Sequence, residues 1–235
     1  MAPRRGSEAF ATEHAYRSQQ AVYRDGTGPD ARDVLETTVT GLPRGDLLEV
    51  GCGEGALAQR LNGDGWRVGA TDASARMCEL TRARGVPTLL AALPELPFRD
   101  ASFDCVVGAW VLHYLDDARV ASGLGEMCRV LRPGGWLVLA TNSDRHMAEL
   151  WSRLPGARYR LSFSEENAGA ALGRFGAQAE ITPVVGTVNF TGYDQAHAFV
   201  ANQVRPRSIA DRLETFDGRL RVTRRAAVIR ARIGG

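Results

Sequence analysis

The sequence of 235 residues contains no lysine, so all 29 of its basic side chains are arginine. They balance 27 acidic residues to a formal net charge of +2. No segment concentrates enough basic residues to line a nucleic-acid groove, so we expect no nucleic-acid partner. No segment approaches the run of about 20 apolar residues that a membrane span requires, and the first ten residues lack the apolar core of a secretory signal. We therefore expect a cytoplasmic protein with no membrane partner.

The residue patterns of several common sites are also missing. The four cysteines form no CxxC pair and fall in or beside expected strands and helices, which is typical of small buried side chains in a reducing compartment. The four histidines lack the spacing of metal ligands, so no metal is expected. GxSxG, HExxH and P-loop motifs are absent. Acyl transfer, metalloproteolysis and phosphoryl transfer therefore have no support in the sequence.

The most informative segment is LLEVGCGEGALA, residues 47–58, in which an apolar strand runs through three alternate glycines into a helix. A side chain at Gly51 or Gly53 would obstruct either the turn or a ligand, and we expect backbone N–H groups to approach a cofactor here. The next apolar stretch ends at Asp72. In a β-α-β unit that spacing places a carboxylate where it can accept hydrogen bonds from both ribose hydroxyls. The sequence therefore predicts an adenosine-bearing cofactor.

The glycine pattern followed by Asp72 also satisfies the dinucleotide fingerprint, so these residues alone leave NAD open. A pyrophosphate, however, favours a helix N-terminus with little negative charge nearby. Glu49 and Glu54 crowd this loop with carboxylates, which suits a cofactor that carries an ammonium group. We expect Glu49 on the cofactor side, where it orients the loop or contacts that ammonium group.

Two further blocks, LPFRDASFD at residues 96–104 and LRPGGWLVLAT at 131–141, follow the glycine loop. In this order the blocks resemble the class I S-adenosylmethionine (SAM)-dependent methyltransferases, over about Tyr23 to Thr141. The resemblance implies SAM as the cofactor and S-adenosylhomocysteine (SAH) as its product.

Strands and helices alternate along the chain, which predicts a sheet covered by helices on both faces. The expected strands span residues 47–50, 67–71, 88–91, 103–108, 136–141, 179–185 and 220–230. The expected helices span residues 9–23, 30–40, 56–61, 74–84, 118–131, 147–154, 165–174 and 194–203. We expect an α/β fold with a Rossmann-like doubly wound sheet of about seven strands, mostly parallel with an antiparallel last strand.

The whole chain, residues 1–235, is expected to form one methyltransferase domain, as a monomer or homodimer. Its parts are N-terminal lid helices over 1–40, a SAM-binding core over 41–141, and acceptor-pocket helices with edge strands over 142–235. The first and last parts are expected to set substrate specificity, because the common core does not need them.

The resemblance implies a set of cofactor-binding residues at the ends of the strands: Tyr23, Glu49, Gly51, Cys52, Gly53, Asp72, Ala73, Met77, Ala92, Leu93 and Ala109. Asp72 is the expected ribose ligand, although the same position suits a helix cap. Met77 is expected near the adenine, with core packing as the alternative. Ala92 replaces an acidic residue that many relatives use for the adenine amine. Adenine recognition is therefore expected from the backbone of Ala92 and Leu93 or from water.

On the acceptor side, the resemblance implies that His113 faces the acceptor. A histidine there can remove a proton from an attacking hydroxyl or amine, and its ordinary pKa of about 6.5 suits neutral pH. The alternative is a helix-start residue bonded to backbone. Trp110 and Tyr114 are expected to contact the acceptor. In similar enzymes the N-terminal segment closes over SAM, and a tyrosine there can bind the methionine carboxylate. The resemblance implies this role for Tyr23, whereas Tyr16 is expected to contact the acceptor, with core packing as the alternative.

The sequence favours a SAM-dependent methyltransferase that methylates an O, N or C atom of a small molecule. An NAD-dependent oxidoreductase and a non-catalytic SAM-fold partner subunit stay open as alternatives. Lysine is absent and isoleucine rare, whereas arginine, alanine and glycine have GC-rich codons. This composition indicates a GC-rich genome such as that of an actinomycete, which favours antibiotic biosynthesis or other secondary metabolism.

Overall fold

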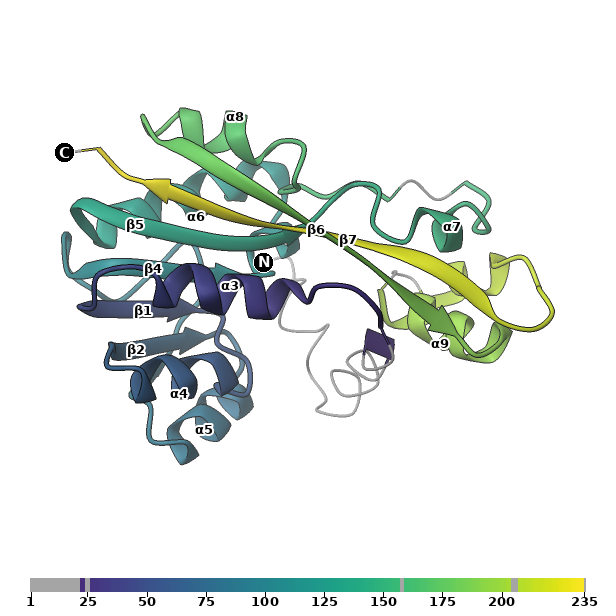
Figure 1. The fold of residues 1–235 in the computed structure, drawn as a ribbon, viewed down its shortest axis with the longest axis horizontal. Coiled ribbons are helices and arrows are strands. Elements are labelled where there is room, and N and C mark those ends of the chain that lie inside the picture. The colour runs from purple at the N-terminus through teal and green to yellow at the C-terminus, as the bar shows by residue number, and fades with distance from the viewer. Residues whose placement is uncertain (1–21, 24–25, 157–158, 204–206, 235) are drawn as a thin grey trace.

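The computed structural model describes residues 22–23, 26–156, 159–203 and 207–234 (Figure 1). Most of the helix expected over residues 9–23 lies outside these ranges, and so does Tyr16. No helix in the described ranges is both long and apolar enough to cross a membrane.

Seven strands form one sheet in the order β3-β2-β1-β4-β5-β7-β6. They are β1 (Asp46–Val50), β2 (Arg67–Asp72), β3 (Thr88–Leu90), β4 (Phe103–Ala109), β5 (Leu131–Asn142), β6 (Gln178–Phe190) and β7 (Leu220–Arg232). The pairs from β3 through to β5 are parallel, whereas β7 runs antiparallel to both β5 and β6. The predicted fold class, including the antiparallel last strand, is confirmed.

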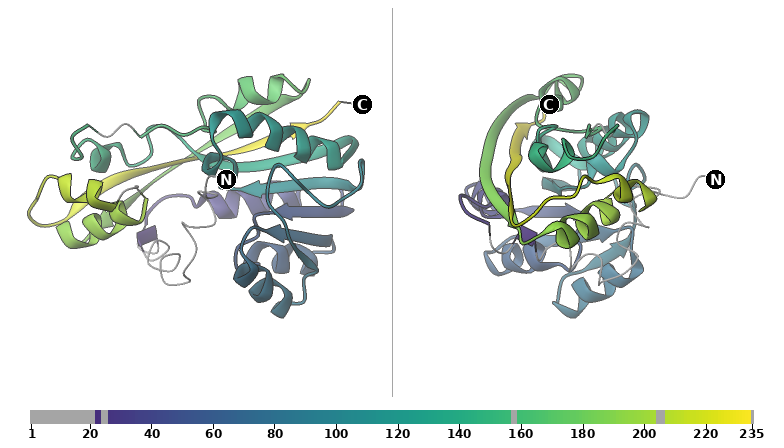
Figure 2. Two further views of the ribbon diagram at one scale, coloured as in Figure 1. Left: turned by 180° about the vertical axis from the view of Figure 1, so that it is seen from behind. Right: turned by 90° about the vertical axis from the view of Figure 1, so that its right-hand side faces the viewer.

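Helices cover both faces of this sheet (Figure 2). The α-helices are α3 (Ala31–Thr40), α4 (Ala56–Gly63), α5 (Ala75–Ala83), α6 (Asp117–Val130), α7 (Ala148–Trp151), α8 (Ala168–Gly173) and α9 (Tyr193–Gln203). Two short 3₁₀ helices, η1 (Leu112–Tyr114) and η2 (Arg207–Arg212), were not expected from the sequence. Apolar side chains of α3 and α4 pack on one face of the sheet, and those of α6 and α8 pack on the other.

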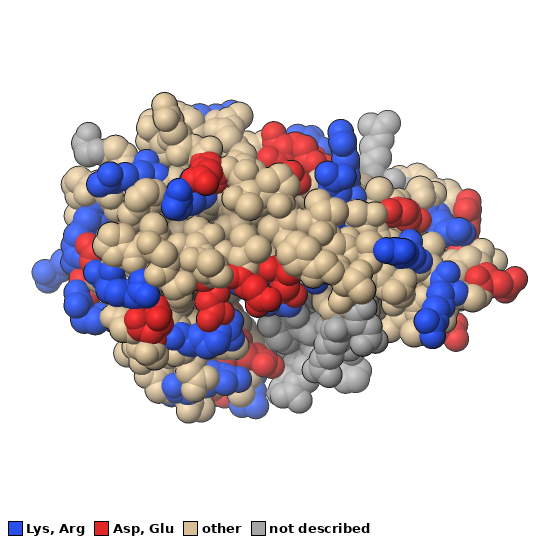
Figure 3. All heavy atoms as spheres, in the orientation of Figure 1, with Lys and Arg blue, Asp and Glu red and all other residues tan. Residues whose placement is uncertain are grey.

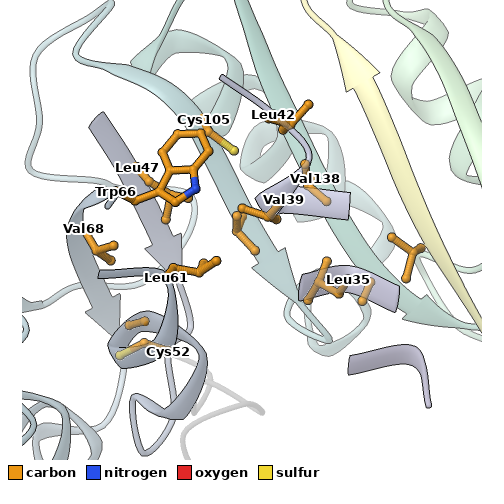
Figure 4. Packing of buried hydrophobic residues seen from close by; sticks show 14 of the residues in the cluster. Leu35, Val39, Leu42, Leu47, Cys52, Leu61, Trp66, Val68, Cys105 and Val138 are labelled. Carbon is orange, nitrogen blue, oxygen red and sulfur yellow. The ribbon is translucent and has the colours of Figure 1, made fainter. Parts of the chain in front are cut away.

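The packing under α3 shows why the amphipathic pattern of this helix is needed. Leu35 and Val39, one turn apart, point into the same cluster as Leu61 of α4 and Val138 of β5 (Figure 4). All four side chains are almost completely buried. Burying a leucine or valine contributes about 1.5–3 kcal/mol. This cluster therefore fixes α3, and the chain that leads into it, against the central strands.

The hairpin of β6 and β7 is longer than the sequence predicted. Its pairing runs from Gln178 opposite Arg232 to Phe190 opposite Leu220, so β6 continues five residues beyond the expected end at Val185. Its outer end carries α9 and η2, and we call these three parts the α9 lobe (Figure 1). A separate hydrophobic cluster holds the lobe together. The expected helices 147–154 and 165–174 are shorter, as α7 and α8.

Charged side chains of both signs are scattered over the face shown in Figure 3. Ion pairs at the surface of the protein include that of Arg60 with Glu36 and that of Arg67 with Asp46. Pairs of this kind contribute little to stability because water screens them.

Candidate functional site

A cavity of about 640 Å³ lies at the carboxyl ends of β1, β2 and β4 and extends to α9. In open α/β sheets, ligands bind at this end of the strands. All of the predicted site residues that the structure describes line this cavity: Tyr23, Glu49, Gly51, Cys52, Gly53, Asp72, Ala73, Met77, Ala92, Leu93, Ala109, Trp110, His113 and Tyr114. The structure therefore brings the predicted cofactor and acceptor residues together in one place.

The glycine loop between β1 and α4 uses its N–H groups internally. Gly51 and Cys52 both donate to the carbonyl of Thr71, at 2.7 and 3.0 Å, and Gly53 donates to Asp72. Gly51 has a φ of +74°, and a Cβ on it would lie 2.4 Å from a methyl of Val111. The sequence predicted that backbone N–H groups of this turn approach a cofactor, and these three are hydrogen-bonded within the protein instead. The glycines are needed for a left-handed turn and close packing, and the three donors are not available to a pyrophosphate.

Glu49 is the most unusual charged group of the site. Only 3% of the residue is exposed to solvent. It accepts a hydrogen bond from the backbone of Ala58, while its Oε2 has no partner among the described residues. Burial, with a smaller contribution from the charge of Asp72, raises the pKa of Glu49 to about 8. The site therefore holds a buried carboxyl with one unsatisfied oxygen, an arrangement suited to a cation.

Asp72 joins the glycine loop to α5. Its Oδ2 accepts the N–H of Gly53 and its Oδ1 accepts the N–H of Ser74, both at 2.9 Å. Burial raises the pKa of Asp72, although these hydrogen bonds oppose the shift. The cap of α5 is Ser74, whose hydroxyl accepts the N–H of Met77, so Asp72 is not needed as a cap. A carboxylate oxygen can accept more than one hydrogen bond, which leaves Asp72 able to bind a diol.

The backbone expected to recognise adenine, at Ala92 and Leu93, already makes contacts within the protein. The carbonyl of Leu93 already accepts a hydrogen bond from the Arg119 guanidinium at 3.1 Å. Ala92 forms an isolated bridge with Glu95. Met77 lines the cavity but is only 3% exposed, so its side chain serves the core as well.

Trp110 stands at the end of β4 in a strained backbone conformation, with a φ of +54°. Its indole N–H donates to Asn142 at 3.0 Å, and the Arg32 guanidinium lies 5.5 Å from the ring centre. Strain of about 1–3 kcal/mol persists only where the surroundings hold it, and it is concentrated at functional sites. The structure thus fixes Trp110 on the cavity wall.

His113 lies in η1 with its ring 4.3 Å from that of Tyr114. Its Nδ1 is buried and has no partner among the described residues. Burial lowers the pKa of His113 to about 4, and the nearby His146 contributes to this shift. The expectation of an ordinary pKa was therefore wrong, because it assumed a solvated ring. The imidazole is neutral throughout the neutral range.

Among the cavity residues missed from the sequence are Asn142, His146, Trp151 and Tyr159. Nδ1 of His146 lies 2.8 Å from the carbonyl of Arg225 and 3.2 Å from the backbone nitrogen of the same residue. The Tyr23 hydroxyl lies within hydrogen-bond distance of Nε2 of the same ring, at 3.3 Å. Their position in the sequence could have indicated them, because Asn142 ends the fifth strand and the other three residues come after it. Ligands bind at this end of the strands.

Part of the cavity lining lies in a segment that has clear relatives. Residues 48–139 match the family described as "Methyltransferase domain". A malonyl-[acyl-carrier protein] O-methyltransferase of Serratia marcescens is 31% identical over 126 residues, which cover 52% of this chain and 49% of that protein. An uncharacterized methyltransferase of Mycobacterium bovis is 39% identical over 99 residues, covering 41% of this chain and 40% of that protein. The chain thus spans about half the length, or less, of these curated relatives.

Solved structures extend the likeness beyond the matched segment. A SAM-dependent methyltransferase from Thermotoga maritima aligns with a TM-score of 0.63 and 21% sequence identity. The alignment covers 97% of this chain and 99% of that chain. A likeness at this identity shows the fold alone, and it includes the β6–β7 hairpin as well as the core.

Proposed function

Because residues 48–139 carry a class I SAM-dependent methyltransferase domain, we propose that the whole protein transfers the methyl group of SAM to a small-molecule acceptor. The family and the cofactor expected from the sequence are confirmed. The proposal extends to a single domain, with residues 142–235 forming the acceptor side, and to an acceptor from secondary metabolism. The composition of the chain supports the last point.

The observation that carries this proposal is the buried Glu49 carboxyl beside the glycine loop. SAM presents an ammonium group, and Oε2 of Glu49 is an unsatisfied acceptor in the same cavity. A dinucleotide would instead bring a pyrophosphate toward this acid, at a loop whose N–H donors at Gly51, Cys52 and Gly53 are already used. An unsatisfied carboxyl oxygen and a loop without available N–H donors therefore fit SAM better than NAD.

Bound SAM supplies a methyl group on a positively charged sulfur, and the acceptor takes that methyl as SAH forms. The chain has to hold the two molecules and exclude water. We assign the ribose to Asp72 and the ammonium group to Glu49. We assign the acceptor proton to His113, because its ring is neutral and its Nδ1 has no protein partner.

Two measurements test the proposed function. In titration calorimetry, SAM and SAH are expected to bind and NAD is not. Labelled SAM is then incubated with metabolites from the native gene neighbourhood, and label is expected to move to one of them. Tight NAD binding without SAM binding would point to the oxidoreductase alternative. SAM binding without transfer to any of these metabolites would support the non-catalytic alternative.

SAM binding is expected to release protons from the protein at neutral pH. The pKa of Glu49 is about 8 in the empty site, above the ordinary 4.5, so its carboxyl is mostly protonated. An ammonium group beside it favours the charged form, and affinity should rise with pH up to about 8. Calorimetry in two buffers of different ionisation enthalpy measures the release. The Glu49→Gln variant should show none, and equal heats for the wild type in both buffers would refute the contact.

A further inference from the structure

The acceptor end of the cavity is walled by a row of aromatic rings. Tyr23, His146, Tyr159 and Trp151 follow one another, with ring centres 6.3, 6.3 and 5.0 Å apart. Their planes are tilted by 36°, 31° and 14°, so the last pair is stacked. Phe199 of α9 meets the Tyr23 ring edge-on. These side chains come from the N-terminal segment, the chain after β5 and the α9 lobe, and all of them line the cavity.

The same wall carries little uncompensated charge. Arg224, which is 8% exposed, is paired with Asp30 at 3.3 Å and donates to the carbonyl of Pro29. Burial lowers the pKa values of His113 and His146 to about 4, so both rings are neutral at neutral pH. A buried anion without a partner costs several kcal/mol. An acceptor with a carboxylate would therefore lose its hydration here and gain no buried cation that is not already paired.

Four other arginines line the cavity among the described residues, and none of them changes this balance. Arg60 is paired with Glu36, and Arg119 donates to the carbonyl of Leu93. Arg160 is exposed, so water screens its charge. Arg32 lies over the Trp110 ring. The polar groups along the wall are neutral: the Asn142 side chain bonds Trp110 and Tyr159, and the Tyr23 hydroxyl bonds His146. Neutral donors and acceptors among ring faces suit a flat molecule with hydroxyl groups.

We propose that the acceptor is a planar aromatic compound without negative charge, which stacks on the ring row and presents a hydroxyl as the methyl-accepting group. This inference rests on the proposed function and narrows its acceptor. The hydroxyl proton passes to the neutral imidazole of His113, and the oxygen lone pair forms the new bond to the methyl carbon. The C–S bond breaks with its electron pair on sulfur, which leaves an aryl methyl ether, SAH and an imidazolium that returns its proton to water.

The test compares three bicyclic probes by calorimetry, with and without saturating SAH. They are 2-naphthol, which is aromatic and neutral, 2-naphthoate, which is aromatic and anionic, and 2-decalol, which is aliphatic with the same hydroxyl. Naphthol is expected to bind at least about tenfold more tightly than either of the others. If naphthoate binds more tightly than naphthol, the claim that the acceptor carries no negative charge is overturned. If decalol binds as tightly as naphthol, the claim that the acceptor is aromatic is overturned.

Variants of one ring test the wall itself. Tyr159→Leu removes a stacked ring and should weaken naphthol binding by about tenfold, whereas Tyr159→Phe keeps the ring and should recover most of the affinity. Trp136→Leu is the control, because Trp136 lies on β5 outside the cavity, under Arg230 and Arg232. If SAH binds but naphthol does not, the inference fails and the proposed function stands. If SAM and SAH do not bind, the proposed function fails. The titration without SAH then still tests whether the cavity prefers a neutral aromatic compound.

Discussion

An Asp72→Ala variant is expected to bind SAM about 30- to 150-fold more weakly than the wild type, a loss of about 2–3 kcal/mol. The proposed ribose diol loses a charged acceptor for two donors. The N–H groups of Gly53 and Ser74 also lose the carboxylate that each of them bonds at 2.9 Å. Both losses occur where Asp72 links the glycine loop to the start of α5. Calorimetry with SAM measures the change directly.

The matched control is Glu79→Ala, on the same helix as the residues that follow Asp72. Glu79 makes a 3.4 Å ion pair with Arg76, and both side chains are more than half exposed. Its removal should leave SAM affinity within about a factor of two. A thermal unfolding curve shows whether each variant is folded. A folded Asp72→Ala protein with wild-type affinity would contradict the ribose assignment.

A His113→Ala variant is expected to lose about 100-fold or more in turnover while SAM affinity stays nearly constant, the scale for losing a positioned base. The pH profile gives a second readout. Because burial lowers the pKa of His113 to about 4, the base stays available through the neutral range and is lost only as the pH falls toward that value. The wild-type rate should therefore decline on the acid side near pH 4, and this limb should vanish in the variant.

Two other histidines make the assignment specific. His197 of α9 pairs with Asp211 and does not line the cavity, so His197→Ala should keep wild-type turnover. His146 lines the cavity and is hydrogen-bonded to Arg225 and Tyr23. If His146→Gln loses turnover and His113→Ala does not, the base has been assigned to the wrong histidine. That result would leave the aromatic acceptor proposal intact.

The sheet was predictable because each strand of the core is a short apolar run between a turn and a helix. Those signals are local, and a parallel sheet follows from their alternation. The outer half of β6 was missed because Gly186 and Asn189 are poor strand residues. Only pairing with β7 makes that segment a strand.

The wall that we propose for the acceptor was less predictable than the glycine loop, for a physical reason. The loop residues act within one β-α unit, so their spacing in the sequence carries their geometry. The hydrogen bond between Tyr23 and His146 instead joins positions 123 residues apart. The depressed pKa of His113 likewise comes from burial by distant segments. No period or motif in the sequence encodes such contacts.

The position of β7 in the sheet also constrains the order in which the parts of the protein can fold. β7 lies between β5 and β6, although it is the last of the three in the chain. A nascent chain that has emerged only as far as β6 has no neighbouring strand to receive it, and the edge of β5 stays open. The pairing of Trp136 with Arg232 must wait for the residues near the carboxyl end. The part of the sheet from β3 to β5 can therefore fold during synthesis, whereas the part formed by β6 and β7 closes only after β7 has left the ribosome.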